Sequence, residues 1–352
     1  MARHTTKPED AAQTKDTSQT CTGVLLVNTG TPEAPKPHAV RRYLSRFLMD
    51  KRIRPMHALP WWFILHLAIL PKRGKASAEK YREIWTKDGS PFVLAHEKLA
   101  LALERALQDE SDEVYVRYAM SYSKPRVRDA LRELRGAGCT KVVVLPLYPQ
   151  SAFSTTGAVR DAVDCALRRL HWRPDLQFVD NYHQNATYIS ALAALIRHTG
   201  FDPTSNDRLL FSFHSIPCVD IEAGDTYELQ TSASSLLIAS ELGLERKRWT
   251  IGYQCRFDKG RDWLEPYTTD VLRRWAFAGE GRVFMVCPNF AVDCLETLYD
   301  VNRELKPHYY RCVMEAGNNA GERSFTYVPC LNSSKAQVKV LAAVLQPYVE
   351  GE

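Results

Sequence analysis

The sequence lacks the short signatures that identify many nucleotide-dependent and metal-dependent enzymes. No G-x-G-x-x-G, G-x-x-x-x-G-K-[ST] or H-E-x-x-H occurs, so dinucleotide-binding, P-loop and zincin interpretations lose their main support. None of the nine cysteines forms a C-x-x-C pair, which excludes a zinc ribbon or a thioredoxin motif. The odd cysteine count and a polar N-terminus without an apolar signal segment favour reduced thiols in a cytosolic protein.

A strong charge imbalance is also missing. The 46 Lys and Arg residues nearly balance 41 Asp and Glu, and the net charge of +5 is too small and dispersed to indicate nucleic-acid binding. With 45% hydrophobic and 25% charged residues, the composition excludes a disordered chain, a collagen-like repeat and a polytopic membrane protein. The 352 residues are enough for about two domains.

No apolar run is long enough to span a bilayer, which needs about 20 residues. The most apolar window, Leu59–Leu70, has proline near each end and is followed by cations at 72, 73 and 75. One interpretation is a buried core helix. The other is an amphipathic lip over residues 59–75 that rests on a membrane surface, with Trp61, Trp62 and Leu65 on it.

What the sequence does contain is a regular alternation of apolar runs and amphipathic segments. Strands are expected at 23–28, 114–120, 141–147, 176–179, 208–213, 249–253, 282–286 and 324–328. Helices are expected at 37–48, 91–108, 127–135, 154–170, 188–198, 231–242, 263–275, 293–303 and 333–346. This alternation predicts an α/β protein with two similar doubly wound, Rossmann-like parallel sheets. We expect a disordered tail at 1–20, one domain at 21–180 and a second at 181–352.

In such folds, ligands bind at the carboxyl ends of the strands, so the residues after each strand are candidates for a site. His214 directly follows one apolar strand and is a candidate base, because the ordinary pKa of a histidine side chain lies near neutrality. The alternative is a histidine that caps the next turn. Ser154–Gly157 opens a helix and could bind an anion or act only as an N-cap.

A row of acidic residues follows another strand. Asp293, Glu296 and Asp300 share one face of an expected helix, and Glu304 extends that row. Clustered carboxylates repel one another unless they share a proton or a cation. The row is therefore either a polar path for a metal ion or protons, or an ordinary solvated acidic face.

Taken together, these strand ends resemble the ferrochelatase family, which inserts ferrous iron into a porphyrin. Eight blocks match in order over about residues 23–346, and the acidic helix is among them. The blocks are LLVNTGTPEAP (25–35), EKYREIW (79–85), DGSPF (88–92), LPLYPQSAFSTTGA (145–158), FSFHSIP (211–217), GDTYELQ (224–230), YQCRFDKGRDWLEPYT (253–268) and CPNFAVDCLETLYD (287–300).

The resemblance implies a chelatase fold, a lyase that makes haem, and roles for particular residues. His214 and Glu296 match the catalytic and metal-contacting pair of the family, with Glu296 facing His214 across the porphyrin. Asp293, Asp300 and Glu304 would continue as a proton or metal path. The residues that match porphyrin contacts or pocket walls are Thr29, Tyr81, Ser90, Tyr122, Tyr148 and Trp263.

The sequence also departs from the family pattern. The position in the Y-P-Q block where animal-type relatives supply a cluster cysteine is Phe153, and only Cys330 follows residue 312, so we predict no [2Fe–2S] cluster and no permanently bound cofactor. Cys294 stands where several relatives have histidine. Ser121 stands where an arginine is frequent, so the porphyrin carboxylates must be bound by other cations.

The apolar lip favours protoporphyrin IX as substrate over coproporphyrin III, which has four propionates instead of two. We expect a cytoplasmic enzyme that can rest on the inner face of the cytoplasmic membrane, with porphyrin and ferrous iron as its partners. A coproporphyrin III ferrochelatase is the main alternative. A cobalt or nickel tetrapyrrole chelatase and a non-catalytic porphyrin-binding protein are further alternatives.

Overall fold

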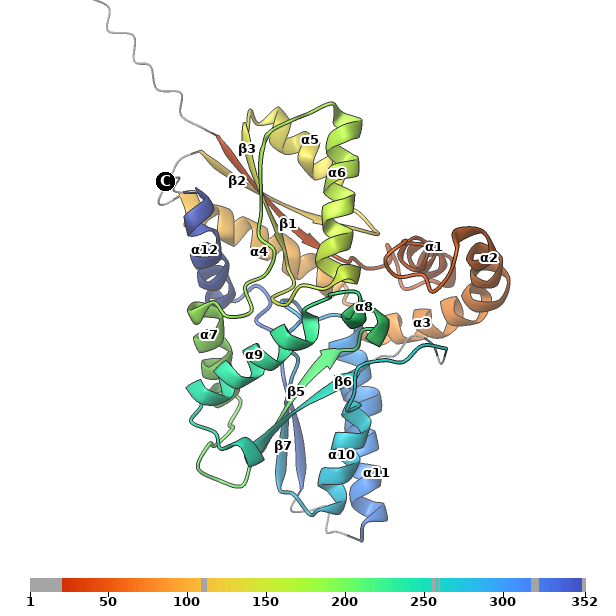
Figure 1. Cartoon of the computed structure of the whole chain (residues 1–352), viewed down its shortest axis with the longest axis vertical. Helices are drawn as coiled ribbons and strands as arrows, with labels where there is room; N and C mark the ends of the chain where they lie inside the picture. The colour runs from red at the N-terminus through yellow and green to blue at the C-terminus, as the bar shows by residue number, and fades with distance from the viewer. Residues whose placement is uncertain (1–20, 109–112, 255–257, 259, 318–322, 350–352) are drawn as a thin grey trace, which may run out of the picture.

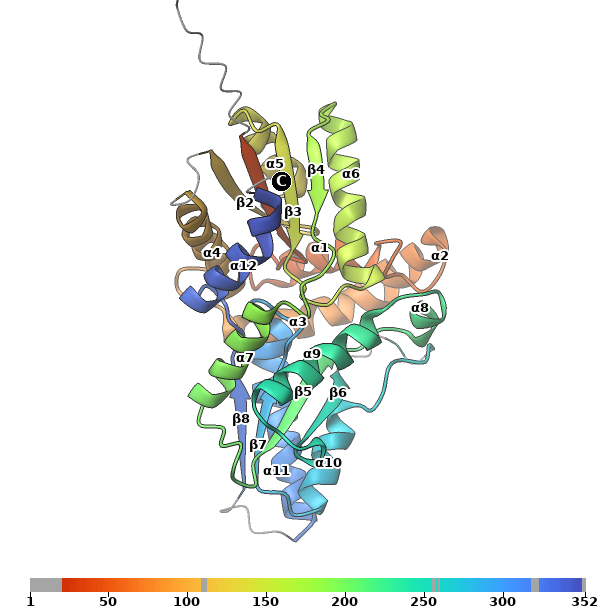
Figure 2. The ribbon, with the colours of Figure 1, turned by 60° about the vertical axis from the view of Figure 1, so that its left-hand side comes forward.

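The computed structural model describes residues 21–108, 113–254, 258, 260–317 and 323–349. The tail expected at 1–20 lies outside them. Two four-stranded parallel sheets lie one above the other (Figures 1 and 2). The first has the order β2-β1-β3-β4 and the second the order β6-β5-β7-β8. The strands are β1 (Thr22–Asn28), β2 (Val114–Met120), β3 (Lys141–Pro146), β4 (Asp175–Phe178), β5 (Arg208–His214), β6 (Trp249–Gln254), β7 (Arg282–Val286) and β8 (Ser324–Val328).

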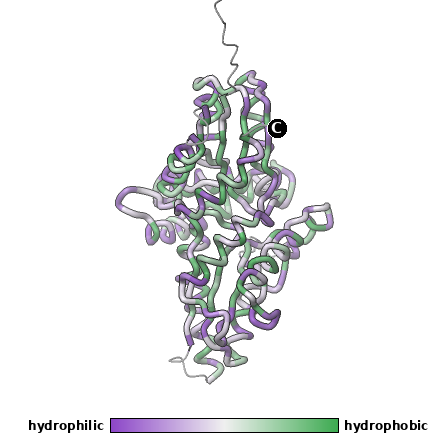
Figure 3. Tube along the Cα trace, turned by 90° about the vertical axis from the view of Figure 1, so that its left-hand side faces the viewer, coloured by the Kyte–Doolittle hydropathy of each residue, from purple (hydrophilic) through white to green (hydrophobic). Residues whose placement is uncertain are grey.

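The central strands are buried along their whole apolar length, as expected for parallel strands covered on both faces. Every residue of β1 is buried, and so are residues 209–213 of β5. Figure 3 shows the apolar strands inside and polar residues on the outer helices. One continuous core includes Val24 and Leu26 of the first sheet and Phe211 and Phe213 of the second. The two sheets therefore share buried apolar surface.

Helices of the N-terminal half cover the first sheet and extend beyond it. They are α1 (Pro37–Leu48), α2 (Ala58–Phe63), the π-helical turn η1 (Ile64–Ile69), α3 (Leu70–Ile84), α4 (Pro91–Gln108), α5 (Val127–Gly136), the π-helical turn η2 (Phe153–Gly157) and α6 (Ala158–Leu170). The α2–η1–α3 arm stands away from both sheets in Figure 1.

Helices of the C-terminal half cover the second sheet. They are α7 (Ala186–His198), α8 (Cys218–Glu222), α9 (Tyr227–Glu241), the 3₁₀ turn η3 (Arg246–Arg248), α10 (Thr268–Phe277), the π-helical segment η4 (Glu296–Leu305), α11 (Lys306–Glu315) and α12 (Lys335–Val349). The last helix, α12, packs on α4 and β3 of the first half as well as on α7. The expected division near residue 180 falls between β4 and α7.

The alternating pattern predicted every strand, and the sheets are those of a two-domain α/β protein. Several helix predictions were wrong in extent, among them the helix expected at 231–242, which is α9 and begins at Tyr227. Residues 263–267 lie outside the helix expected at 263–275, because α10 begins at Thr268. The helix expected at 293–303 begins at Glu296 and continues into α11. The start of the helix expected at 154–170 is the π-helical turn η2.

The apolar window 59–70 is mostly exposed, so it is not a buried core helix. Leu59 and Leu67 are 71% and 73% exposed, and Trp62 is 43% exposed. Leu65 differs, because it is fully buried against the core under the arm. Trp61 is partly buried, and its indole N–H donates to the Leu48 carbonyl at 2.7 Å. No helix among the described residues is long and apolar enough to cross a membrane.

Candidate active site

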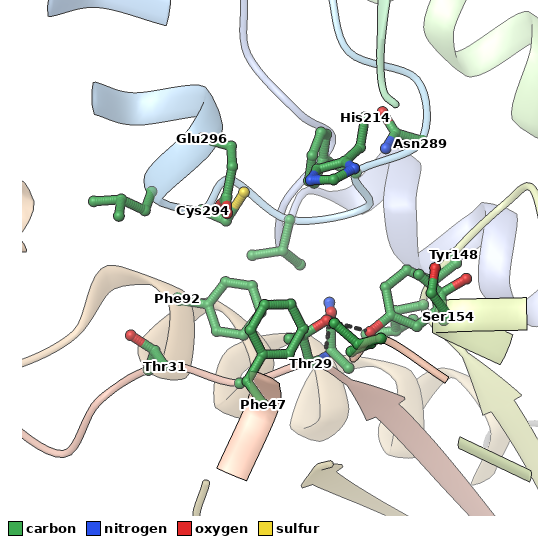
Figure 4. Close-up of a pocket in the computed structure, with 18 of the residues that line it drawn as sticks. Thr29, Thr31, Phe47, Phe92, Tyr148, Ser154, His214, Asn289, Cys294 and Glu296 are labelled. Carbon is green, nitrogen blue, oxygen red and sulfur yellow. Dashed lines mark hydrogen bonds between the residues drawn. The ribbon is translucent and has the colours of Figure 1, made fainter. Parts of the chain in front are cut away.

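A pocket lies where the carboxyl ends of both sheets meet (Figure 4). It encloses about 1220 Å³, including space open to solvent. In each sheet the strand order reverses beside the central strand, between β1 and β3 or between β5 and β7, and ligands of doubly wound folds bind at that switch point. Of the residues predicted for the site, the pocket is lined by Thr29, Tyr81, Ser90, Tyr148, His214, Trp263, Asp293 and Glu296.

The N-terminal wall is built from neutral groups that hydrogen-bond to one another. The hydroxyls of Thr29, after β1, and Tyr148, after β3, lie 2.6 Å apart. Asn28 accepts from the Thr29 backbone N–H at 2.7 Å, and its amide N–H donates to Nε2 of His96 at 3.1 Å. Tyr43 donates to the Gly30 carbonyl at 3.0 Å. These groups are neutral and are held in place by their own hydrogen bonds.

His96 is a buried member of this network that the sequence analysis missed. It is fully buried, and burial lowers its pKa to about 4. Its Nδ1–H donates to the Phe92 carbonyl at 2.6 Å, so the ring is neutral and Nε2 accepts from Asn28. His96 lies on α4, far in the sequence from any strand end, so the sequence gave no sign that it contacts Asn28.

Tyr122 does not line the pocket, unlike the other residues predicted to contact the porphyrin. Its ring packs edge-on against Phe47, with centroids 5.2 Å apart, and its hydroxyl donates to Asp50 at 2.8 Å. Phe47 lies on the pocket wall between Tyr122 and the cavity. Tyr122 therefore supports a wall residue rather than forming the wall.

His214 is the last residue of β5 and is held from two sides. Tyr227 on α9 donates to the His214 carbonyl at 3.0 Å, and the Ser215 N–H donates to Gln254 on the neighbouring strand. The ring Nδ1–H donates to the Ser215 carbonyl at 2.6 Å, which leaves Nε2 with the lone pair. Burial lowers the pKa of His214, and the nearby Glu296 partly opposes that shift.

Glu296 stands at the start of η4, on the same side of the pocket as His214 (Figure 4). The expectation that these two side chains face each other across the cavity was therefore wrong. Both come from the C-terminal half, because β5 and the segment after β7 belong to one sheet. Thr29 and Tyr148 lie opposite them. Burial and the carboxylate of Glu296 raise the pKa of the neighbouring Cys294, so this thiol stays protonated.

Asp293 lines the pocket, but its carboxylate is already engaged. One oxygen accepts from the hydroxyls of Thr297 at 2.8 Å and Tyr327 at 2.7 Å, and the other accepts from the Asn332 amide at 2.7 Å. Its own N–H donates to Asn332 at 2.8 Å. Asp293 thus joins the segment before η4 to the end of β8.

The rest of the acidic row leads away from the pocket toward solvent. The side chain of Asp300 is 17% exposed and that of Glu304 is 53% exposed. Lys80 on α3 contacts both, at 2.8 Å and 2.6 Å. Burial raises the pKa of Asp300 to about 6, although Lys80 acts against that shift.

Two arginines of the pocket wall were not predicted. Arg52 contacts Asp161 through two nitrogens, at 2.6 Å and 3.2 Å. Arg261 contacts Asp258 in the same way, at 3.0 Å and 2.7 Å, and lies 5.0 Å from the Trp263 ring centroid. No described side chains of His, Cys, Asp or Glu form a group of three or more that could hold a metal ion. The predicted absence of an iron–sulfur cluster stays a prediction.

Comparison with known proteins shows the family of the chain. The family model for ferrochelatase matches residues 21–348. The ferrochelatase of Nitrosococcus oceani is 39% identical over 332 residues, covering 94% of this chain and 87% of the relative. That of Methylococcus capsulatus is 42% identical and covers 93% and 97%. A solved structure titled "SirB from Bacillus subtilis with Fe3+" is similar in fold, with a TM-score of 0.53, 10% identity and coverage of 92% and 95%.

The two-sheet fold, the pocket between the sheets and these relatives define a metal chelatase, an enzyme of the lyase class. The chain belongs to the ferrochelatase family.

Proposed function

We propose that this enzyme inserts ferrous iron into protoporphyrin IX, giving protohaem and releasing two protons. The observation that carries the proposal is the contrast between the two pocket walls. His214 and Glu296 are titratable and lie on one side, and the neutral Thr29–Tyr148 pair lies on the other. A flat macrocycle bound between these walls would have its central nitrogens next to His214 and Glu296.

Insertion requires that two pyrrole N–H protons leave while a dication enters. The lowered pKa of His214 keeps its imidazole neutral near pH 7, so Nε2 can accept a proton. Glu296 lies close enough to influence the pKa of His214 and would contact the iron or take up a proton. Asp300 and Glu304 extend from there to the surface and would carry iron inward or protons outward. Asp293 would fix the start of that row.

The porphyrin carboxylates are proposed to bind near Arg52 and Arg261. These are the Lys or Arg side chains among the described pocket residues, and each already contacts a carboxylate of the protein. Two such arginines suit a substrate with two propionates better than one with four. The decisive experiment compares kcat/KM for anaerobic iron insertion into the two porphyrins. A higher value for protoporphyrin IX supports the proposal, and a higher value for coproporphyrin III contradicts it.

We further propose that the α2–η1–α3 arm rests on the inner face of the cytoplasmic membrane through its α2 and η1 segments. Leu59, Trp62, Phe63 and Leu67 are exposed on it. Binding of the protein to vesicles of mixed zwitterionic and anionic lipid should fall in Trp62→Glu/Leu67→Glu, and should be unchanged in Leu229→Glu, which alters an exposed leucine on α9. Equal vesicle binding by both variants and the unmodified chain would contradict the proposal.

The prediction that no [2Fe–2S] cluster is bound completes the proposed function. The purified protein should lack the visible absorption of such a cluster. A cluster spectrum, with iron and inorganic sulfide in a ratio of one to one, would overturn it.

A further inference from the structure

Two segments to which the proposed chemistry assigns no role meet beside the pocket. One is the β3–η2 segment, residues 150–157, whose Ser154 and Thr155 line the pocket. The other is the GDTYELQ block at 224–230, which leads into α9 of the other half. Two polar side chains of this block are buried where the segments meet. Asp225 is 6% exposed and Gln230 is 7% exposed.

The carboxylate of Asp225 is hydrogen-bonded to both halves. One oxygen accepts from the Phe153 N–H at 2.6 Å, and the other accepts from the Tyr227 N–H at 2.9 Å. The Tyr227 hydroxyl in turn donates to the His214 carbonyl at 3.0 Å. Phe153 directly precedes Ser154, which Figure 4 shows opposite His214. Three hydrogen bonds in series therefore connect the two walls of the pocket.

Gln230 makes a second contact between the same segments. Its carbonyl oxygen accepts from the Ser151 N–H at 2.9 Å, and its amide donates to the Ser151 hydroxyl at 2.9 Å. The sequence left Ser154–Gly157 as either an anion site or an N-cap. The anion bound at the start of this turn is the chain's own Asp225 carboxylate. The β3–η2 segment is thus attached to α9 through its backbone.

We propose that Asp225 and Gln230 are positioning residues that fix the distance between the β3–η2 segment and the His214 strand end, so that the porphyrin fits closely between the walls. The inference rests on the proposed function, because it treats this space as the porphyrin site. The shared core and the packing of α12 also join the halves. Loss of the Asp225 contact should therefore release the segment and weaken porphyrin binding without separating the halves.

Phe153 offers a way to remove the donor of this contact. It is the first residue of η2, and the backbone of the preceding Ala152 is extended, so proline is compatible with the position. Phe153→Pro deletes the N–H that Asp225 accepts. Phe153→Ala is the matched control, because it loses the same exposed ring, which does not line the pocket, and keeps the N–H.

The direct measurement is the Kd for metal-free protoporphyrin IX on the full chain, from quenching of tryptophan fluorescence without iron. Phe153→Pro and Asp225→Asn should each bind about tenfold more weakly, because the charged hydrogen bond between the segments is lost. Phe153→Ala should bind within about twofold of the unmodified chain. The double variant Phe153→Pro/Asp225→Asn should bind no more weakly than either single variant, because both changes remove one interaction.

A buried aspartate away from the pocket controls for loss of stability. Asp207 is 2% exposed, accepts from the Asp202 N–H at 2.9 Å and contacts Arg282 at 2.7 Å. It lies just before β5, at the end of that strand opposite His214, and does not line the pocket. Asp207→Asn should lower the free energy of unfolding at least as much as Asp225→Asn does and leave the porphyrin Kd unchanged.

Kinetics separate positioning from a merely structural role. In anaerobic insertion assays, Asp225→Asn should raise KM for the porphyrin about tenfold and leave KM for ferrous iron unchanged. A structural role would lower the active fraction and hence the apparent kcat, with both KM values unchanged. Gln230→Leu, which removes the bonds to Ser151, should also raise KM for the porphyrin, and it decides the proposal if the other variants fail to fold.

The proposal is overturned if Phe153→Pro and Asp225→Asn bind the porphyrin as tightly as Phe153→Ala does. It is also overturned if Asp207→Asn weakens binding equally, or if the effects of Phe153→Pro and Asp225→Asn multiply in the double variant. An unmodified chain that bound no porphyrin would instead contradict the proposed function.

Discussion

The two central strands occupy equivalent places in sheets of the same order, yet their last residues have different surroundings. β1 ends at Asn28 and β5 ends at His214, and both residues line the pocket. The Asn28 amide is bonded to buried His96 and to the next backbone N–H. His214 instead donates a hydrogen bond from Nδ1–H to the Ser215 carbonyl, and its second ring nitrogen, Nε2, remains basic near Glu296.

In the proposed function, this difference separates binding from chemistry. In the N-terminal wall, the neutral side chains of Asn28, Thr29 and Tyr148 form hydrogen bonds within the protein, as suits the face of a flat apolar ring. The C-terminal wall carries the groups that can change charge. The same topology thus supplies two crevices, and in the proposed function the side chains at the strand ends make one of them reactive.

The largest expected effect comes from removing the base of the reactive wall. His214→Ala should lower kcat for iron insertion by roughly 10³-fold, because loss of a general base typically costs 10²- to 10⁴-fold. Porphyrin affinity, measured by quenching of tryptophan fluorescence, should change less than about threefold because the opposite wall is intact. Near-normal turnover by this variant would disprove the assignment of the base.

Replacing Asp293, which joins the segment before η4 to the end of β8, should lower the free energy of unfolding more than it lowers porphyrin affinity. Asp293→Ala leaves buried donors of Thr297, Tyr327 and Asn332 without their acceptor, and we expect a loss of about 3 kcal/mol in the free energy of unfolding. Denaturant unfolding measures this loss. Glu304→Gln, at an exposed position of the same row, is the control and should change stability by less than about 0.5 kcal/mol. Equal effects of the two changes would contradict the anchoring role.

The neutral wall should respond to acid through His96. Its pKa is about 4 in the folded chain and near 6.5 when unfolded, so the unfolded chain binds an extra proton between these values. The free energy of unfolding is therefore unaffected by His96 above pH 6.5, and below that pH it falls by about 1.4 kcal/mol per pH unit toward pH 4. The total contribution is about 3 kcal/mol for this fully buried group.

His96→Gln should make the free energy of unfolding less dependent on pH in this range. His38→Gln, at an exposed position on α1, is the matched control. Because burial also lowers the pKa of His214, the slope of the unmodified chain contains both contributions, and only the difference between variants reports on His96. Identical pH slopes for His96→Gln and the unmodified chain would show that the ring is not buried neutral.

Much of the fold could be predicted because buried parallel strands have a recognisable sequence pattern of continuous apolar residues. Runs such as Val142–Leu145 and Leu209–Phe211 are apolar without alternation, as is typical of strands covered on both faces. The arm was harder to assign, because an exposed apolar helix and a buried one have the same composition. Only the structure shows Leu67 exposed and Leu65 buried two residues earlier.

The lining of the pocket was predictable where residues lie at or just after strand ends, as with His214 and Tyr148. Contacts between residues that lie far apart in the sequence were not predictable. His96 contacts Asn28 from a helix 68 positions away, and Lys80 contacts Asp300 from 220 positions away. A contact between distant segments gives no local pattern, so neither contact could be inferred from spacing.

The smallest expected effect tests the binding wall itself. Tyr148→Phe removes one hydroxyl of the 2.6 Å pair with Thr29, and we expect KM for the porphyrin to rise about fivefold with kcat unchanged within twofold. Thr29→Val should have a similar effect, and the double variant should be little worse than either, because both changes remove one interaction. A hundredfold fall in kcat with unchanged KM would instead place Tyr148 in the chemistry, and the separation between a binding wall and a reactive wall would then fail.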